Sequence, residues 1–312
     1  MECITNKKIY DKNVKCVEYK SFEFYKELAK SKYIITNQNL PLPFKYRKET
    51  KLIQTWHGIP LKKMFLQLDK VVGRDSGYNN RMMGYINEWD YLLTSSKYQS
   101  NKMIEAFDYK NEIIEIGNPR NDYYLRTDQN ESKNKIKNLI THNDKKNIIY
   151  APTFRDGGNK KGQKFEFKLD FDFEYFKNEL SEEYNLLLRM HPISYFDTSI
   201  LKEYDFIFNV SNYENEMELL NGSDILITDY SSVMFDFLFM KKPVLLYLFD
   251  HDEYITNRPL NKEISMEEIG DVVYTSKSLL EKIKYNQFKD SKNIRKIFFD
   301  ENEKCSLKIL NK

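Results

Sequence analysis

Residues 225–249 read ILITDYSSVMFDFLFMKKPVLLYLF, and this segment decides which fold class the chain adopts. An apolar strand pattern ends at Thr228-Asp229, two serines follow, and an apolar helix pattern begins at once and leads into a second strand. A strand, a tight turn, a helix and another strand in this order are typical of α/β proteins with parallel sheets. Turns of this kind that bind phosphate usually contain glycines, and this one has none. The segment therefore raises the question of what two serines at the start of a helix could hold.

Short apolar runs that predict further strands occur along the chain in two sets. The first set covers 33–37, 51–57, 91–96 and 112–118, and the second covers 147–153, 184–192, 206–211, 225–231, 243–249 and 272–276. Amphipathic segments that predict helices lie between them, at 97–107, 173–183, 214–221, 232–240 and 277–286. Most runs are continuous rather than alternating, as expected of strands buried on both faces of a parallel sheet. The polar, lysine-rich segment 126–147 separates the two sets, and we expect one exposed helix in it. The pattern predicts two Rossmann-like halves that face a cleft.

The composition excludes several classes of protein. The chain has 312 residues, of which 41% are hydrophobic and 31% charged, so it can build two sizeable cores. Its net charge of +2 argues against a dedicated nucleic-acid binder. The three cysteines, Cys3, Cys16 and Cys305, lack the number and spacing of a disulfide framework or a zinc site.

No segment of the sequence predicts a membrane span or a signal peptide. The N-terminus, MECITNKKIYDK, has no apolar core, and the apolar run 233–249 is interrupted by an aspartate and by a Lys-Lys-Pro sequence. We therefore expect a cytoplasmic protein. It could still touch a membrane surface through basic stretches such as 45–51 and 62–63, although such stretches are most often a solvated face.

Five predicted strands end in residues that ligand sites use. In chain order these ends are Trp56-His57-Gly58-Ile59-Pro60, Gly117-Asn118-Pro119-Arg120, Ala151-Pro152-Thr153-Phe154-Arg155-Asp156, Arg189-Met190-His191-Pro192 and Asp229-Tyr230-Ser231-Ser232. Ligands gather at the carboxyl ends of parallel strands, so we expect one site along this rim. A single histidine before Gly or Pro is more typical of a turn, but two of them, accompanied by Arg and Ser, favour a site. Neither has metal-ligand spacing, and the other two histidines, His142 and His251, are expected on the surface.

The two serines at 231 and 232 have two interpretations. One of them could simply cap the helix, which is the commonest use of serine at this position. Alternatively, their hydroxyls and the unpaired N–H groups of the helix start could hold phosphate oxygens without glycine. Asp236 lies one helical turn further in, too far along to be only a cap, and could accept hydrogen bonds from ribose or polyol hydroxyls. Together these residues describe a site for a nucleotide-linked polyol or sugar.

The segment 154–164, FRDGGNKKGQK, resembles a phosphate loop superficially but lacks the Gly-Lys-Ser/Thr of a Walker A sequence. We interpret it as a mobile loop over the cleft whose lysines could meet an anionic acceptor. The alternative, that these lysines only keep the protein soluble, stays open.

Several blocks of the chain resemble, in the same order, those of CDP-glycerol glycerophosphotransferases. The blocks are WHGIPLKKM, GNPRND, YAPTFRD, RMHP, SDILITDYSSVMFDF and KPVLLYLFDHDEYITNR, and they cover roughly 51–258. This family comprises teichoic-acid primases and polymerases and is related to ribitol-phosphate and capsule polymer transferases. The resemblance implies a GT-B-like fold of two Rossmann-type domains with the donor between them. We expect an acceptor-side domain over 1–125, a linker over 126–146, a nucleotide-donor-binding domain over 147–290 and a helical tail over 291–312 that packs back on the first domain.

The resemblance also implies roles for individual residues. His57 is expected to be the catalytic base, and His191 a second essential histidine near the donor phosphates. Donor contacts are expected at Trp56, Gly58, Ile59, Pro60, Arg120, Pro152, Thr153, Arg189, Met190, Ser231, Ser232 and Asp236. Asn118, Arg155, Asp229 and Arg258 are further candidates, although Pro259 stands where a glycine usually follows Arg258 in the family.

The reaction implied is transfer of glycerol phosphate or ribitol phosphate from a CDP-activated donor, with release of CMP. The acceptor would be a hydroxyl of a lipid-linked saccharide or of a growing teichoic-acid or capsule-type polymer, which would bring the enzyme to the inner membrane surface. No cofactor is required by this chemistry, and a need for Mg²⁺ stays open. Arg120 could reach in from the other domain, so that domain closure completes the site. Two alternatives remain: a GT-B glycosyltransferase that uses a nucleotide sugar, and a non-catalytic nucleotide-binding assembly subunit.

Overall fold

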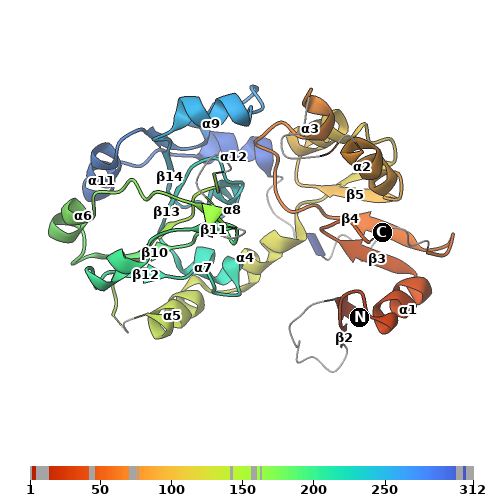
Figure 1. Cartoon of the computed structure of the whole chain (residues 1–312), viewed down its shortest axis with the longest axis horizontal. Helices are drawn as coiled ribbons and strands as arrows, with labels where there is room; N and C mark the ends of the chain where they lie inside the picture. The colour runs from red at the N-terminus through yellow and green to blue at the C-terminus, as the bar shows by residue number, and fades with distance from the viewer. Residues whose placement is uncertain are drawn as a thin grey trace.

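The computed structural model of the chain describes residues 2–4, 14–41, 46–69, 75, 77–140, 143–155, 160–161, 164–299 and 305–306. It has two lobes, each built on a parallel sheet (Figure 1). The N-terminal sheet has four strands in the order β3-β4-β5-β6, and the C-terminal sheet has six in the order β12-β10-β7-β13-β14-β15. The predicted α/β class with parallel sheets is confirmed. Much of the predicted loop 154–164, and His142, lie outside the described residues.

The N-terminal sheet carries its helices on one face. Its strands are β3 (Tyr33–Thr36), β4 (Lys51–Gln54), β5 (Tyr91–Thr94) and β6 (Glu112–Glu115), and the helices are α1 (Phe22–Lys30), α2 (Tyr78–Ile86) and α3 (Lys97–Phe107). Buried residues of all three helices share one hydrophobic cluster with Ile34, Leu52 and Leu92 of the sheet. The alternate strand residues Ile53, Leu93 and Ile114 form a separate small cluster, because successive side chains of a strand point to opposite faces. A short parallel pair, β1 (Glu2–Ile4) and β2 (Lys15–Val17), accompanies this lobe.

The C-terminal sheet is covered by helices on both faces. Its strands are β7 (Lys146–Tyr150), β10 (Tyr184–Leu188), β12 (Ile207–Asn209), β13 (Ile225–Thr228), β14 (Val244–Tyr247) and β15 (Asp271–Val273). One face packs on α7 (Glu216–Gly222), α8 (Val233–Phe239), α10 (Met266–Ile269) and α12 (Lys292–Phe298), and the other on α6 (Phe173–Glu179) and α11 (Ser276–Lys284). A small sheet of β8 (Lys160–Lys161), β9 (Lys164–Glu166) and β11 (Ser194–Tyr195) lies beside them, and α9 (His251–Asn257) follows β14.

The segment that joins the lobes contains η2 (Pro119–Asn121), α4 (Asp122–Arg126) and α5 (Gln129–Leu139). The expectation that its helix is exposed is wrong for one face of α5. Ser132 and Ile136 are buried, and a Cβ atom on Gly222 of α7 would lie 2.6 Å from Ile136 Cδ1. The segment is polar overall, so the sequence did not reveal that two residues one helical turn apart, Ser132 and Ile136, form a buried contact.

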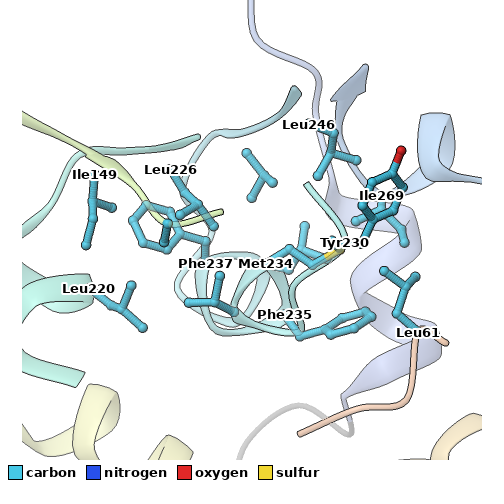
Figure 2. Close-up of a cluster of buried hydrophobic side chains, with 14 of the residues drawn as sticks. Leu61, Ile149, Leu220, Leu226, Tyr230, Met234, Phe235, Phe237, Leu246 and Ile269 are labelled. Atoms are coloured by element: carbon cyan, nitrogen blue, oxygen red, sulfur yellow. The ribbon is translucent and has the colours of Figure 1, made fainter. Parts of the chain in front are cut away.

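The chain that follows β4 leaves its own sheet and enters the C-terminal lobe. Ile59 and Leu61 are 2% and 5% exposed and belong to the hydrophobic cluster around α8 (Figure 2). Lys63 N donates to Pro259 O at 2.9 Å, and Asn261 N donates to Leu61 O at 3.0 Å. Pro259, the residue after Arg258, therefore anchors this crossing through its carbonyl. A proline can do this as well as the glycine that the family usually has at this position.

Helix α12 of the C-terminal lobe makes a contact in the opposite direction, toward the N-terminal lobe. Phe298 of α12 packs edge-on against Phe235 of α8, with ring centroids 4.6 Å apart, and against Tyr98 of α3 at 5.2 Å. Beyond it, Cys305 N and Ser306 N donate to the carboxylate of Asp122, at 2.8 and 2.9 Å. Both crossings tie the two lobes together beside the strand ends. In the described part of the chain, no helix combines the length and the apolar character needed to cross a membrane.

Candidate active site

His57 lies in a strained turn at the end of β4. Trp56 has a φ of +54°, a conformation that bulky residues rarely adopt and that is often found at functional sites. Gln54 Oε1 accepts from Trp56 N at 2.9 Å, and the indole packs on Phe107 with centroids 5.0 Å apart, which together hold this turn. The imidazole of His57 stacks on Trp56 at 4.3 Å. The most strained residue in the turn thus supports the imidazole directly.

The hydrogen bonding of His57 suits a proton acceptor. Its Nδ1 lies 3.2 Å from Asn37 O, and because a carbonyl can only accept, Nδ1 carries the proton and Nε2 the free lone pair. Partial desolvation, with a smaller contribution from the Arg120 charge, lowers the pKa of His57 from its ordinary value. The imidazole is therefore neutral near pH 7, with Nε2 available as a base.

Gly58 brings this turn against the two serines. A Cβ atom on Gly58 would lie 2.8 Å from Ser232 Oγ and 3.1 Å from Ser232 Cβ, closer than real Cβ atoms approach. The turn after β4 and the turn after β13 are thus in direct contact, although they belong to different lobes. A glycine is needed here because any side chain would separate them.

The serines are not used as ordinary helix caps. Ser232 is the residue before α8 and its side chain accepts no capping hydrogen bond, while Ser231 Oγ accepts from Val233 N only at 3.4 Å. Both side chains are half-buried. The capping interpretation is therefore wrong for Ser232, and its hydroxyl can donate to a ligand.

His191 follows β10 and is held in the opposite tautomer. Its Nδ1 accepts from Ile193 N at 3.3 Å, so the proton of the neutral ring lies on Nε2, which can donate to a phosphate oxygen. Desolvation lowers the pKa of His191, and Lys62 and Arg258 add to this, whereas Glu216 opposes it. Lys62 comes from the segment that crosses from the N-terminal lobe. Both lobes therefore contribute charges around this ring.

Arg120 connects the two turns. Its Nη1 donates to His57 O at 3.3 Å, and its Nε lies 3.1 Å from Asp236 Oδ1. Tyr124 also donates to Asp236 Oδ1, at 3.1 Å. Asp236 is 6% exposed, and burial raises its pKa to about 6 although Arg120 opposes this. The prediction that Arg120 reaches toward the other lobe agrees with these contacts. Asp236, predicted to accept hydrogen bonds from ribose or polyol hydroxyls, pairs with Arg120 through Oδ1.

Arg189 and Thr153, both predicted to contact the donor, donate hydrogen bonds to other groups of the protein in this structure. Arg189 Nη1 donates to the carbonyls of Val210, Ser211 and Tyr213, at 3.0, 3.0 and 2.7 Å. Thr153 donates through N and Oγ1 to Asp229 Oδ1, at 2.8 and 2.7 Å. Its single hydroxyl proton is thereby committed, so it cannot also donate to a phosphate.

Arg155 and Asp229, named as further candidates, belong to a partly buried ion-pair network. Arg155 Nη2 lies 2.9 Å from Asp229 Oδ2, and Arg155 Nε lies 2.5 Å from Asp250 Oδ2. The guanidinium also lies over the Tyr254 ring, 4.7 Å from its centroid. These charges join the ends of β7, β13 and β14.

Of the remaining predicted contacts, the apolar ones are buried. Ile59 and Met190 are core residues, and Pro60 and Pro152 are buried as well, so these residues can offer a ligand little beyond their backbone. Asn118 lines a separate hollow with Ser95, Asn121 and Cys305. Arg258 lies over the Phe154 ring, 4.8 Å from its centroid, and Phe154 in turn lies 4.8 Å from the His191 ring, which places Arg258 at the site.

Sequence reasoning did not name Asn37, Tyr124 or Glu216 as site residues. It noted Lys62 only as part of a basic stretch and did not predict that its charge acts on His191. Asn37 acts through its carbonyl, which any residue has, and Tyr124 acts from a helix between the two strand sets. Glu216 could have been found, because it begins the helix that follows strand 206–211. Across the described ranges, no group of three or more His, Cys, Asp or Glu side chains is placed to hold a metal ion. Whether the reaction needs Mg²⁺ stays open, as it was from the sequence.

Comparison with known proteins shows what the chain is similar to. The family model of CDP-glycerol:poly(glycerophosphate) glycerophosphotransferases matches residues 3–307. A teichoic acid poly(glycerol phosphate) polymerase of Bacillus spizizenii is 35% identical over 303 residues, which cover 95% of this chain and 77% of the relative. The corresponding polymerase of Bacillus subtilis is 33% identical over 88% of this chain, which covers only 37% of that longer protein. The structure of a variant of the wall teichoic acid polymerase TagF soaked with CDPG superimposes with a TM-score of 0.81 at 28% identity, over 96% of this chain and 75% of that one.

Proposed function

Since the chain belongs to the CDP-glycerol:poly(glycerophosphate) glycerophosphotransferase family, we propose that it transfers glycerol phosphate from CDP-glycerol to an acceptor hydroxyl and releases CMP. The observation that carries this proposal is the contact between Gly58 and Ser232. The residue that follows His57 thus touches the turn that carries the two serines, and this supports a site in which the neutral His57 imidazole and the serine hydroxyls act on one ligand. A base beside a phosphate-binding turn is the arrangement that transfer of a phosphoryl group to a hydroxyl requires.

The reaction proceeds by attack of the acceptor oxygen on the distal phosphorus of the donor. His57 Nε2 takes the proton of the acceptor hydroxyl as the new P–O bond forms, a contribution of about 10²–10⁴ in rate. The bond between that phosphorus and the bridging oxygen breaks, and the oxygen leaves with CMP. We assign the stabilisation of the negative charge that develops on CMP to His191, to Lys62 and Arg258, whose charges act on its ring, and to the serine hydroxyls.

The acceptor is proposed to be a lipid-linked saccharide or a growing polyol-phosphate polymer, which places the enzyme at the cytoplasmic face of the membrane. The names of the relatives, which include a glycerol-phosphate primase and a ribitol-phosphate polymerase, support a cell-wall polymer as the product class. Ribitol phosphate is the alternative cargo. Binding to vesicles that contain anionic lipid tests the membrane part, because each Lys or Arg near such a surface contributes about 1 kcal/mol.

Release of nucleotide from purified protein tests the function. CMP release from CDP-glycerol with a lipid-linked acceptor supports the proposal, CMP release from CDP-ribitol alone identifies the other cargo, and UDP release from a UDP-sugar would overturn the proposal in favour of a glycosyltransferase. Binding without any turnover would indicate a non-catalytic subunit. His57→Ala should lose turnover and keep donor affinity in calorimetry, whereas His251→Ala, which removes an imidazole outside the proposed chemistry, should keep both.

A further inference from the structure

Glu216 is an exposed acidic residue whose charge acts on the same part of the site as the cations Arg120, Lys62 and Arg258. It is the first residue of α7, and its side chain is 46% exposed. Its Oε2 lies 3.5 Å from Arg120 Nη2. It is also close enough to His191 to raise the pKa of that ring, which Lys62 and Arg258 lower. A carboxylate in this place competes with any anionic ligand for the same cations.

Arg120 does not depend on Glu216 for its position. The guanidinium is held by the buried carboxylate of Asp236 at 3.1 Å and by His57 O at 3.3 Å, both shorter than the 3.5 Å contact with Glu216. The Glu216 contact is the longest of the three, and the Glu216 side chain is 46% exposed whereas that of Asp236 is 7% exposed. This contact can therefore be exchanged for a ligand oxygen while the other two contacts persist.

We propose that Glu216 is a built-in counterion that pairs with Arg120 while the site is empty and is displaced by the diphosphate of the bound ligand. The proposal rests on the function proposed above for the identity of the ligand, but its physical content is only that a diphosphate competes with this carboxylate. The consequence is a weaker affinity than the cations alone would give. A site that holds its nucleotide product less tightly releases it faster, so the carboxylate favours turnover over retention.

The sign of the effect separates this role from that of a ligand-binding residue. Glu216→Gln removes the charge and keeps the shape, so it should bind a diphosphate more tightly than the unmodified protein does. Exposed charge pairs contribute up to about 1 kcal/mol, and a diphosphate carries more than one charge, so a gain of about three- to tenfold in affinity is expected at low salt. The gain should shrink at about 1 M salt, where exposed charges are screened within roughly 3 Å.

The experiment measures binding of inorganic pyrophosphate by calorimetry, which needs neither the nucleoside nor turnover. The control is Glu183→Gln, because Glu183 also pairs with a cation, Lys146 at 2.6 Å, but lies at the opposite end of β10 from His191. The control should bind pyrophosphate as the unmodified protein does. Tighter, salt-sensitive binding by Glu216→Gln alone supports the proposal. Equal or weaker binding by this variant, or no binding by either protein, overturns it.

A second readout is independent of any ligand. The chain has only four histidines, so their ring signals can be followed by NMR as the pH is varied. Of the described charged groups that act on His191, Lys62 and Arg258 lower its pKa and Glu216 raises it. Glu216→Gln should therefore lower the pKa of His191, and an unchanged midpoint would contradict the proximity on which the proposal depends. If pyrophosphate and NMR give the expected results but no donor is turned over, the proposed function fails and this inference stands.

Discussion

Replacing Gly58 by alanine tests whether the His57 turn and the serine turn are in contact. The new Cβ atom would lie 2.8 Å from Ser232 Oγ and 3.1 Å from Ser232 Cβ. Forcing extra atoms into a packed contact costs about 1–3 kcal/mol, and we expect Gly58→Ala to lower the free energy of unfolding by this amount. If the turns separate by about 1 Å, transfer should fall by about 10²-fold, because the base no longer reaches the attacking hydroxyl.

The double variant makes this test specific. Ser232→Ala removes the oxygen that makes the shortest contact, so Gly58→Ala combined with Ser232→Ala should be more stable than the sum of the two single changes predicts. Contacting residues show interaction energies of about 0.5–3 kcal/mol in such cycles. The rescue should be partial, since the contact at 3.1 Å remains. Urea unfolding of the four proteins measures the interaction. Additive energies, within about 0.3 kcal/mol, would refute the contact between the turns.

Three further predictions concern the groups around this contact. Because desolvation lowers the pKa of His57, and only its neutral form can accept a proton, kcat/KM should rise with pH through a midpoint below 6.5; a higher midpoint would contradict this. Asp236→Asn removes the buried carboxylate that pairs with Arg120 and should cost about 3 kcal/mol in urea unfolding and most of the turnover, whereas normal turnover would show that the pair is dispensable. Asp122→Ala removes the acceptor for Cys305 N and should cost about 1 kcal/mol; no loss would mean that this carboxylate does not anchor the chain end.

The long elements of the fold could be predicted from the sequence because their signals are local. The predicted helix 97–107 coincides with α3, and the continuous apolar runs located the strands of both main sheets. The run 112–118 ends early as a strand, at Glu115, because Gly117 turns the chain with a φ of +103°. The small sheet of β8, β9 and β11 was missed, because its strands have two or three residues and show no measurable periodicity.

The chemistry of the site was less accessible to sequence reasoning than its location. The expectation that ligands gather at the carboxyl ends of parallel strands singled out both histidines and both serines, which follow the ends of β4, β10 and β13 in the structure. It could not show that Arg189 and Thr153 are committed to carbonyls and to a carboxylate, since such partners come from distant parts of the chain. Nor could sequence reasoning give the tautomers of the two histidines. The tautomer of His57 follows from the carbonyl of Asn37, and that of His191 follows from the N–H of Ile193.

The crossing after His57 changes how motion between the lobes should be understood. The sequence suggests that domain closure completes the site by bringing Arg120 in from the other domain. Ile59 and Leu61, however, are buried in the core of the C-terminal lobe. Extracting two such side chains would cost about 3–6 kcal/mol, before the backbone hydrogen bonds of this crossing are counted. His57 is therefore coupled to the lobe that carries Ser232, and any rearrangement on acceptor binding should move the four-stranded sheet around a fixed pair of turns.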